Sequence, residues 1–148
     1  MAEPGAELAT WCQFFNEIGI LHQLSRTVLE RHLPAGMSAA HFSVLNYLVR
    51  VKDGQTPRAL AAALQVAKTT MSHTLSGLQA RELIMIKRNP LDGRSKQVWL
   101  TPAGGRLRLA AIGSLGEDVA RLAGQFDTRR VRAVNRLPAV RQAAGASG

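Results

Sequence analysis

The sequence predicts a mainly α-helical protein that carries one small β-hairpin. Three observations favour this class. Leu and Ala supply most of the apolar residues, and aromatic residues make up only 5% of the chain, a balance that favours helices. Apolar residues recur every three or four positions through most of the sequence. Residues 83–100 change to a two-residue alternation around a group of turn-forming residues, which is typical of a hairpin.

Length and composition fit one compact unit with helical extensions. The chain has 148 residues and is 46% hydrophobic, enough to form a core. No run approaches the roughly 20 apolar residues that span a bilayer, and the start "MAEPGAELATW" lacks the features of a secretory signal. A lone cysteine cannot form an internal disulfide. We therefore expect a cytoplasmic protein with no membrane partner.

The first three predicted helices are marked by caps and breaks. Residues 6–32 form an amphipathic helix that ends at "LPAGMS", and Ser38 is placed to cap a second helix. Thr56 followed by Pro57 is typical of an N-cap and first helical position, which predicts a third, short helix. After "QVA", a fourth helix is expected at about residues 68–81. Two short helices joined by about three residues form a helix-turn-helix.

The second half of the chain begins with the predicted hairpin. Ile84 and Ile86 alternate with Met85 and Lys87 on the outgoing strand, and Val98 and Leu100 alternate on the return. The segment "NPLDG", which holds three turn formers, lies between them. "TP" then begins a long helix at residues 102–126, whose apolar residues repeat as in a coiled coil. A last helix containing Val131, Val134 and Leu137 is expected to end or kink at Pro138.

Positive charge is concentrated in the middle of the chain. The net charge is +9, and residues 52–108 hold ten Lys and Arg against three Asp and Glu, a net of +7. Such a surface attracts polyanions, nucleic acid before anionic membrane. Composition alone is equally compatible with a basic protein that is merely soluble, so the motifs have to decide.

The fourth helix has an unusual exposed face. Met71, Leu75 and Leu78 fall on one arc and are expected to face the core. The opposite arc carries short polar side chains where an exposed helix usually carries Glu and Lys. Short side chains let a helix enter the DNA major groove, about 12 Å wide, and reach base edges and phosphates. The candidate DNA-contacting residues on this helix are Lys68, Thr69, Thr70, Ser72, His73 and Ser76.

The basic hairpin favours this interpretation over an ordinary solvent-exposed face. A helix-turn-helix followed by a basic hairpin is a winged helix, in which the second helix enters the major groove and the wing follows the backbone into the minor groove. The predicted binding partner is therefore double-stranded DNA. The candidate wing residues are Arg88, Asp92, Arg94 and Lys96.

The wing and the helix-turn-helix also resemble a known family. "NPLDGRSKQVWLTPAGGRL" and "LAAALQVAKTTMSHTLSGLQARELI" are similar to the corresponding parts of the MarR family of dimeric bacterial transcription regulators, and the resemblance extends over roughly residues 8–136. It implies that Arg94 enters the minor groove and that Asp92 braces it. The chain departs from the family at Gly93, where many members have a second Arg, and at Ala67, where a Ser or Thr cap is common.

The terminal helices predict a homodimer. The apolar stripes of the first helix and of the long helix cannot be covered by so small a core, so we expect an identical chain packed about a two-fold axis, as the resemblance also implies. Residues 1–33 would then form a dimerisation helix, residues 34–101 the winged helix-turn-helix DNA-binding domain, and residues 102–148 the C-terminal dimerisation helices and tail. A dimer would bind an inverted-repeat operator, more often as a repressor than as an activator by resemblance.

The resemblance further implies a signal that releases DNA. Many members release DNA when a small, often aromatic or phenolic, effector binds. Trp11, Phe15 and His41 are candidates to line such a site, although the two aromatic residues also fit a core or interface and His41 also fits a helix cap.

Cys12 is a candidate redox residue because one branch of the family senses organic peroxides through a cysteine in its first helix. The nearby Glu7 and Glu17 disfavour the reactive thiolate. The interpretation of Cys12 as a small packing residue is therefore favoured.

Other function classes find little support. The chain lacks GxSxG, P-loop, GxGxxG and HExxH motifs, so we predict no enzymatic activity and no cofactor. Its four histidines show no metal-ligand spacing. Two alternatives stay open: a winged helix that acts as a protein-interaction or scaffold module without reading DNA, and a peroxide-sensing regulator that uses Cys12.

Overall fold

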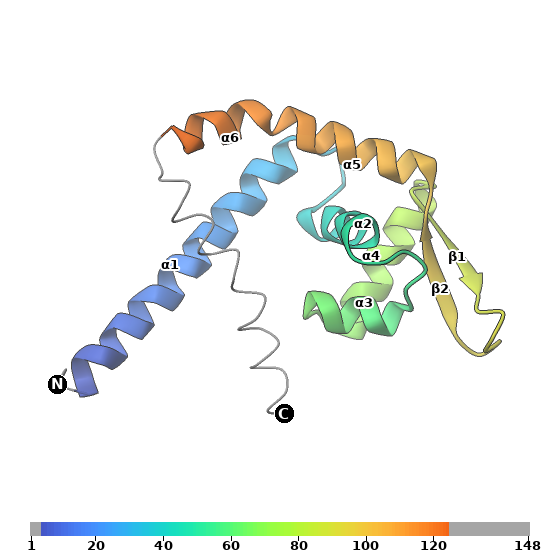
Figure 1. Cartoon of the computed structure of the whole chain (residues 1–148), viewed down its shortest axis with the longest axis horizontal. Helices are drawn as coiled ribbons and strands as arrows, with labels where there is room; N and C mark the ends of the chain where they lie inside the picture. The colour runs from blue at the N-terminus through green and yellow to red at the C-terminus, as the bar shows by residue number, and fades with distance from the viewer. Residues whose placement is uncertain (1–3, 125–148) are drawn as a thin grey trace. The chain divides into compact units, whose positions relative to one another are not determined.

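A computed structural model of the chain describes residues 4–124, which form six helices and one two-stranded antiparallel sheet (Figure 1). This confirms the predicted fold class. The chain divides into two units after Ser114. The elements of the first unit are α1 (Pro4–Arg31), α2 (Ala39–Arg50), α3 (Pro57–Leu64), α4 (Lys68–Ala80), β1 (Ile84–Arg88), β2 (Lys96–Leu100) and α5 (Pro102–Ser114).

The predicted caps begin three of these helices. Ser38 is the N-cap of α2, and Thr56 is the N-cap of α3, where its Oγ1 accepts a hydrogen bond from the N–H of Ala59. Thr101 precedes α5 and accepts in the same way from the N–H of Gly104. The hydroxyls of Thr56 and Thr101 each bind a backbone donor that the first turn of the helix leaves unpaired.

One core joins the helix-turn-helix to the hairpin. Fully buried side chains come from every element between α2 and β2, and α5 adds Ala111. The largest of them are Val44, Leu45, Leu48, Leu60, Met71, Leu78, Ile84 and Val98. Burial of these side chains stabilises the angle between α3 and α4, because neither helix is long enough to be stable alone.

The predicted hairpin is present, and its strands pair apolar residue with apolar residue. Ile84 pairs with Leu100, Ile86 with Val98, and Arg88 with Lys96. The apolar pairs therefore share one face of the sheet and pack on the core, while the basic pair lies at the end nearest the tip.

The prediction of one continuous helix at residues 102–126 was wrong, because the observed helix is interrupted. α5 ends at Ser114, and a separate helix, α6 (Gly116–Ala123), begins after Leu115. Gly113 and Gly116 flank this break, and glycine costs a helix about 1 kcal/mol relative to alanine. The predicted last helix with Val131, Val134 and Leu137, and the stop at Pro138, lie outside the described residues.

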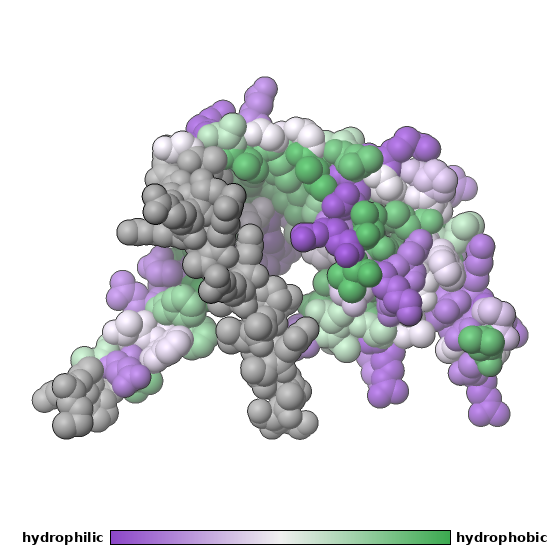
Figure 2. Space-filling view, in the orientation of Figure 1, coloured by the Kyte–Doolittle hydropathy of each residue, from purple (hydrophilic) through white to green (hydrophobic). Residues whose placement is uncertain are grey.

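Much of α1 lies on the surface of the chain. Its apolar residues Leu8, Phe15 and Leu21 are 60–65% exposed, and α1 becomes half-buried only from Val28 onward. Figure 2 shows further hydrophobic surface over α5, where Leu109 is also exposed. The expectation that one chain cannot cover these helices agrees with this exposure. Within residues 4–124, no helix is long and apolar enough to cross a membrane.

Candidate nucleic-acid interface

α4 presents two different faces. Met71, Leu75 and Leu78 are at most 3% exposed, as the helical spacing predicts. Thr74 is also buried, and its Oγ1 donates to the carbonyl of Thr70, so its hydroxyl is satisfied within the helix. All six candidate residues of this helix are exposed on the other side: Lys68, Thr69, Thr70, Ser72, His73 and Ser76.

The start of α4 carries no side-chain cap. Ala67 is the N-cap residue in an extended conformation, and no side chain accepts a hydrogen bond there. The helix nevertheless begins at Lys68, and Met71 N–H donates to the Ala67 carbonyl. The remaining first-turn N–H groups, together with the positive end of the helix dipole and Lys68, suit an anionic group such as a phosphate.

The wing tip is shaped by two Asx turns. Asn89 Oδ1 accepts from the N–H of Leu91, and Asp92 Oδ1 accepts from the N–H of Arg94 at 3.1 Å. The Asn89 N–H donates to the carbonyl of Ser95, which closes the loop. Asp92 therefore contacts Arg94 at its backbone, and the guanidinium of Arg94 stays exposed.

The surface of the wing is basic, with an exposed apolar residue at its tip. The candidate residues Arg88, Arg94 and Lys96 are exposed. Leu91, which no sequence pattern marks as a functional residue, is 95% exposed. Figure 2 shows a small hydrophobic spot at the free end of the hairpin, surrounded by hydrophilic residues.

The root of the wing is held by the loop between α2 and α3. Asp53 Oδ1 accepts from the backbone N–H of Leu100 at 2.9 Å and also from the N–H of Gly54. The carbonyl of Gln55 accepts from Val98 N–H at 2.8 Å. These bonds set the orientation of the hairpin relative to the helix-turn-helix. The sequence could not reveal this contact, because Asp53 and its partner are 47 residues apart.

His41 contacts the fourth helix. Its Nδ1 lies 3.0 Å from the backbone nitrogen and 2.9 Å from the hydroxyl of Ser38, so the imidazole takes the place that Glu or Gln occupies in a capping box. Its Nε2 lies against Gly77 of α4, where an added Cβ would be only 2.6 Å from it. Partial burial, and then the charges of Arg81 and His73, lower the pKa of His41.

The other candidates for an effector or redox site lie on α1. Trp11 and Phe15 form an aromatic cluster with Phe14, with ring centroids 5.7–6.2 Å apart. Cys12 is exposed beside them and is not part of the core of this chain. Trp11 lies about 30 Å along the helix axis from the end of α1, at a rise of about 1.5 Å per residue. His41 lies beyond that end, at the start of α2. The structure therefore does not bring His41 together with the aromatic residues.

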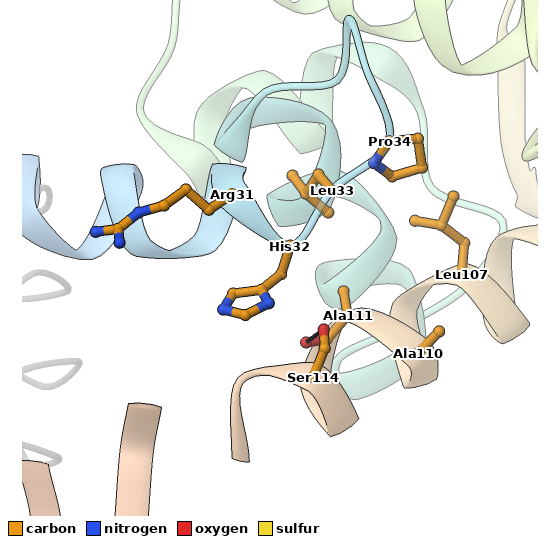
Figure 3. Close-up of a pocket in the computed structure, with 8 residues that line it drawn as sticks. All are labelled: Arg31, His32, Leu33, Pro34, Leu107, Ala110, Ala111 and Ser114. Carbon is orange, nitrogen blue, oxygen red and sulfur yellow. Dashed lines mark hydrogen bonds between the residues drawn. The ribbon is translucent and has the colours of Figure 1, made fainter. Parts of the chain in front are cut away.

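A different place offers a cavity. An open cavity of about 470 Å³ lies between the end of α1, the linker to α2, and α5. Figure 3 shows the His32 imidazole directed toward the part of α5 that carries Ser114, whereas Arg31 extends along α1. The lining residues are Arg31, His32, Leu33, Pro34, Leu107, Ala110, Ala111 and Ser114. The sequence could not indicate this cavity, since its two walls are about 70 residues apart. Within residues 4–124, no group of three or more His, Cys, Asp or Glu could hold a metal ion.

Beside this cavity, at the junction of α1 and α2, the Glu30 carboxylate is held by two contacts. Glu30 Oε1 accepts from the N–H of Ala39 at 2.8 Å and lies 3.5 Å from the guanidinium of Arg26. The hydrogen bond from Ala39 is the main cause that lowers the pKa of Glu30, and Arg26 adds to it. Glu30 thus binds α1 to the N-terminus of α2, the helix that carries His41.

Comparison with known proteins agrees with this architecture. Residues 35–95, from the linker before α2 to the wing, match the model of the MarR family. No curated protein matches the chain.

Solved structures share the fold over most of the chain. The crystal structure of a MarR family transcription regulator is 24% identical, covers 97% of this chain and 95% of its own, and has a TM-score of 0.74. PcaV from Streptomyces coelicolor, in complex with its natural ligand, is 21% identical with a TM-score of 0.70 and covers 88% of this chain and 91% of its own. A mutant of S. aureus MepR bound to an oligodeoxyribonucleotide is 24% identical with a TM-score of 0.57 and covers 90% and 96%.

Proposed function

We propose that two copies of this chain bind an inverted-repeat DNA operator and repress transcription. The premise is that the chain belongs, over residues 35–95, to the MarR family of winged helix-turn-helix transcriptional regulators. The observation that carries this proposal is one composite surface. The short polar side chains of α4 are exposed, and the basic wing is bound to the same core through the root contacts of Asp53 and Gln55.

The charge of this surface favours DNA over a protein partner. Arg88, Arg94 and Lys96 are exposed on the wing, and a scaffold module has no need of them there. The fold is also that of MepR, which has been solved bound to an oligodeoxyribonucleotide. We infer that α4 enters the major groove and that Arg94 reaches the minor groove.

A homodimer is supported by the exposed apolar side of α1. Leu8, Phe15 and Leu21 would be costly to leave in water, because burial of a large apolar side chain contributes about 1.5–3 kcal/mol. A second copy is the simplest partner. A two-fold dimer would place two α4 helices about one DNA turn, roughly 34 Å, apart, and the operator would then be an inverted repeat.

Release by a small molecule is supported by the cavity at the α1–α2 junction. Its volume of about 470 Å³ lies within the range of about 300–1,000 Å³ typical of ligand sites. PcaV, which shares the fold, has been solved with its natural ligand. We propose a small aromatic or phenolic effector for this cavity. Oxidation of the exposed Cys12 is the alternative signal, and Glu7 and Glu17 on the same helix argue against it.

Selection of bound duplexes from a random pool tests the proposal. DNA reading predicts an enriched inverted repeat, and a gel shift on it should weaken steeply with salt, because each neutralised phosphate contributes a slope near −0.9. A scaffold module would enrich no sequence. Loss of operator binding after mild peroxide in the wild type, but not in Cys12→Ser, would support the oxidative signal instead of the small effector.

A further inference from the structure

We propose that His41 supplies the side chain that α4 lacks at Gly77, and that its Nε2–H binds a DNA phosphate beside the surface that reads the groove. This inference rests on the proposed DNA-binding function and adds to it a contact from outside the helix-turn-helix and the wing. The probe ligand is a phosphate of duplex DNA.

The orientation of the imidazole is set by Ser38. The backbone N–H of Ser38 can only donate, so His41 Nδ1 must accept at 3.0 Å. In a neutral imidazole the proton is then on Nε2. The second contact, 2.9 Å from Ser38 Oγ to the same Nδ1, holds the same edge of the ring. The opposite edge therefore presents an N–H donor in a fixed direction.

That donor lies where α4 has a gap. Thr69, His73, Gly77 and Arg81 follow one another at four-residue steps, so they form one line along the helix. Three of these positions carry polar side chains, and the fourth carries none. A Cβ at position 77 would lie 2.6 Å from Nε2 of His41, so the absence of a side chain is what lets the imidazole from α2 occupy this place in the line.

The surroundings of Nε2 suit an anion. Arg81 and His73 lie close enough to lower the pKa of His41 through their charges, after the larger effect of partial burial. The acidic residue near the N-terminus of α2 is Glu30. Its Oε1 accepts from the Ala39 N–H and lies close to the guanidinium of Arg26. The hydrogen bonds of the described residues include no acceptor for His41 Nε2. A phosphate oxygen would satisfy this donor next to two basic side chains.

Phosphate is favoured over a base edge by position. The row of polar side chains along α4 is completed at Gly77 by His41, which belongs to α2, the helix that flanks α4. When a helix lies in the major groove, elements that flank it meet the sugar-phosphate backbone at the groove edge, and such contacts hold the register of the helix on the duplex. His41 is therefore a positioning contact for α4, and it carries no base specificity of its own.

A methylphosphonate scan of the selected operator tests the inference. Each phosphate is replaced in turn by the neutral group, at the same position in both half-sites, and affinity is measured for the wild type, His41→Ala and the control His22→Ala, an exposed histidine on α1. We expect His41→Ala to weaken binding about tenfold for each half-site, the effect of one lost hydrogen bond to a charged group, and therefore about a hundredfold for the dimer. We also expect His41→Ala and the wild type to bind with equal affinity to the duplex that carries methylphosphonate at one particular position of each half-site. In that duplex the wild type has already lost the bond from His41 to the phosphate.

The outcomes separate a DNA contact from a helix cap. If His41 only caps α2, the affinity of His41→Ala should be lower than that of the wild type by the same factor at every methylphosphonate position, and that result overturns the inference. Equal affinity of His41→Ala and wild type for unmodified DNA also overturns it. His41→Glu keeps an acceptor for the Ser38 N–H but repels a phosphate, so it should bind more weakly than His41→Ala. If the wild type binds no duplex, the proposed function itself fails.

Discussion

The carboxylate of Asp53 and the backbone N–H of Leu100 form a hydrogen bond of 2.9 Å across 47 residues of sequence. The same oxygen accepts from Gly54 N–H, so one side chain joins the α2–α3 loop to the last residue of β2. Through this bond the wing keeps its orientation relative to α4, and the distance between the two DNA-binding elements is set by the fold.

Replacement of Asp53 tests this relationship. Asp53→Ala leaves two part-buried N–H groups without their acceptor, so the free energy of unfolding should fall by about 1–3 kcal/mol. Asp53→Asn keeps a carbonyl oxygen and should lose less. Denaturant unfolding of the three proteins measures both effects, and an alanine variant as stable as the wild type would contradict the role of Asp53.

The wing should contribute salt-dependent affinity with little sequence preference. Arg94→Ala removes an exposed cation at each wing, so we expect weaker binding to most duplexes and a salt slope smaller by about 1 per wing, about 2 for the dimer. Gel shifts at several salt concentrations measure the slope. Arg26→Ala removes the same charge from α1 and is the matched control. An unchanged slope in Arg94→Ala would exclude a phosphate contact by this residue.

The contact between His41 and Gly77 should appear as coupling between two mutations. Alanine in place of glycine within a helix usually adds about 0.5–1 kcal/mol of stability. At position 77 the new Cβ meets His41 Nε2 at 2.6 Å, so this gain should be lost in the wild type and regained in the His41→Ala background. Denaturant unfolding of the four proteins in the cycle gives the coupling, which we expect to exceed about 0.5 kcal/mol. Additive effects would mean that the two residues do not touch in solution.

Stability should fall in mild acid because of His41. Burial, Arg81 and His73 hold its pKa in the folded chain below the usual value. Between the two pKa values the unfolded chain binds more protons, so the free energy of unfolding decreases as the pH falls below about 6.5, and the contribution is fully present above it. His41→Gln should remove this part of the pH dependence.

Denaturant unfolding of wild type and His41→Gln between about pH 5 and 7.5 checks the slope. Glu30 acts in a separate, more acidic window, because its pKa is also lowered and its contribution is lost only as the pH falls through that lowered value. Parallel curves for the two proteins would show that His41 titrates alike in both states.

The exposed apolar side of α1 should determine the oligomeric state. Phe15→Glu places a charge within the aromatic cluster, so we expect a shift from dimer toward monomer at micromolar concentration. Light scattering measures the mass. Gln13→Glu adds the same charge at an exposed polar position of α1 and is the control. A monomeric wild type would contradict the proposed dimer.

Much of the local structure was accessible from the sequence because it depends on near neighbours. Ser38, Thr56 and Thr101 bond to groups three residues away, so their patterns predicted where α2, α3 and α5 begin. Alternation at Ile84 and Val98 predicted the hairpin. The two faces of α4 followed from helical spacing alone. The interruption at Leu115 was missed, since the apolar repeat continues across it while Gly113 and Gly116 weaken the helix.

What the amino-acid order determines here is where α2, α3 and α5 begin, where the hairpin lies, and which side chains of α4 face the core, because these follow from contacts within a few residues. The tertiary structure alone decides that Asp53 bonds to Leu100, that His41 occupies the gap at Gly77, and that residues 31–34 and 107–114 enclose a cavity. Each of these depends on packing between segments distant in sequence, and burial of the shared core sets those distances.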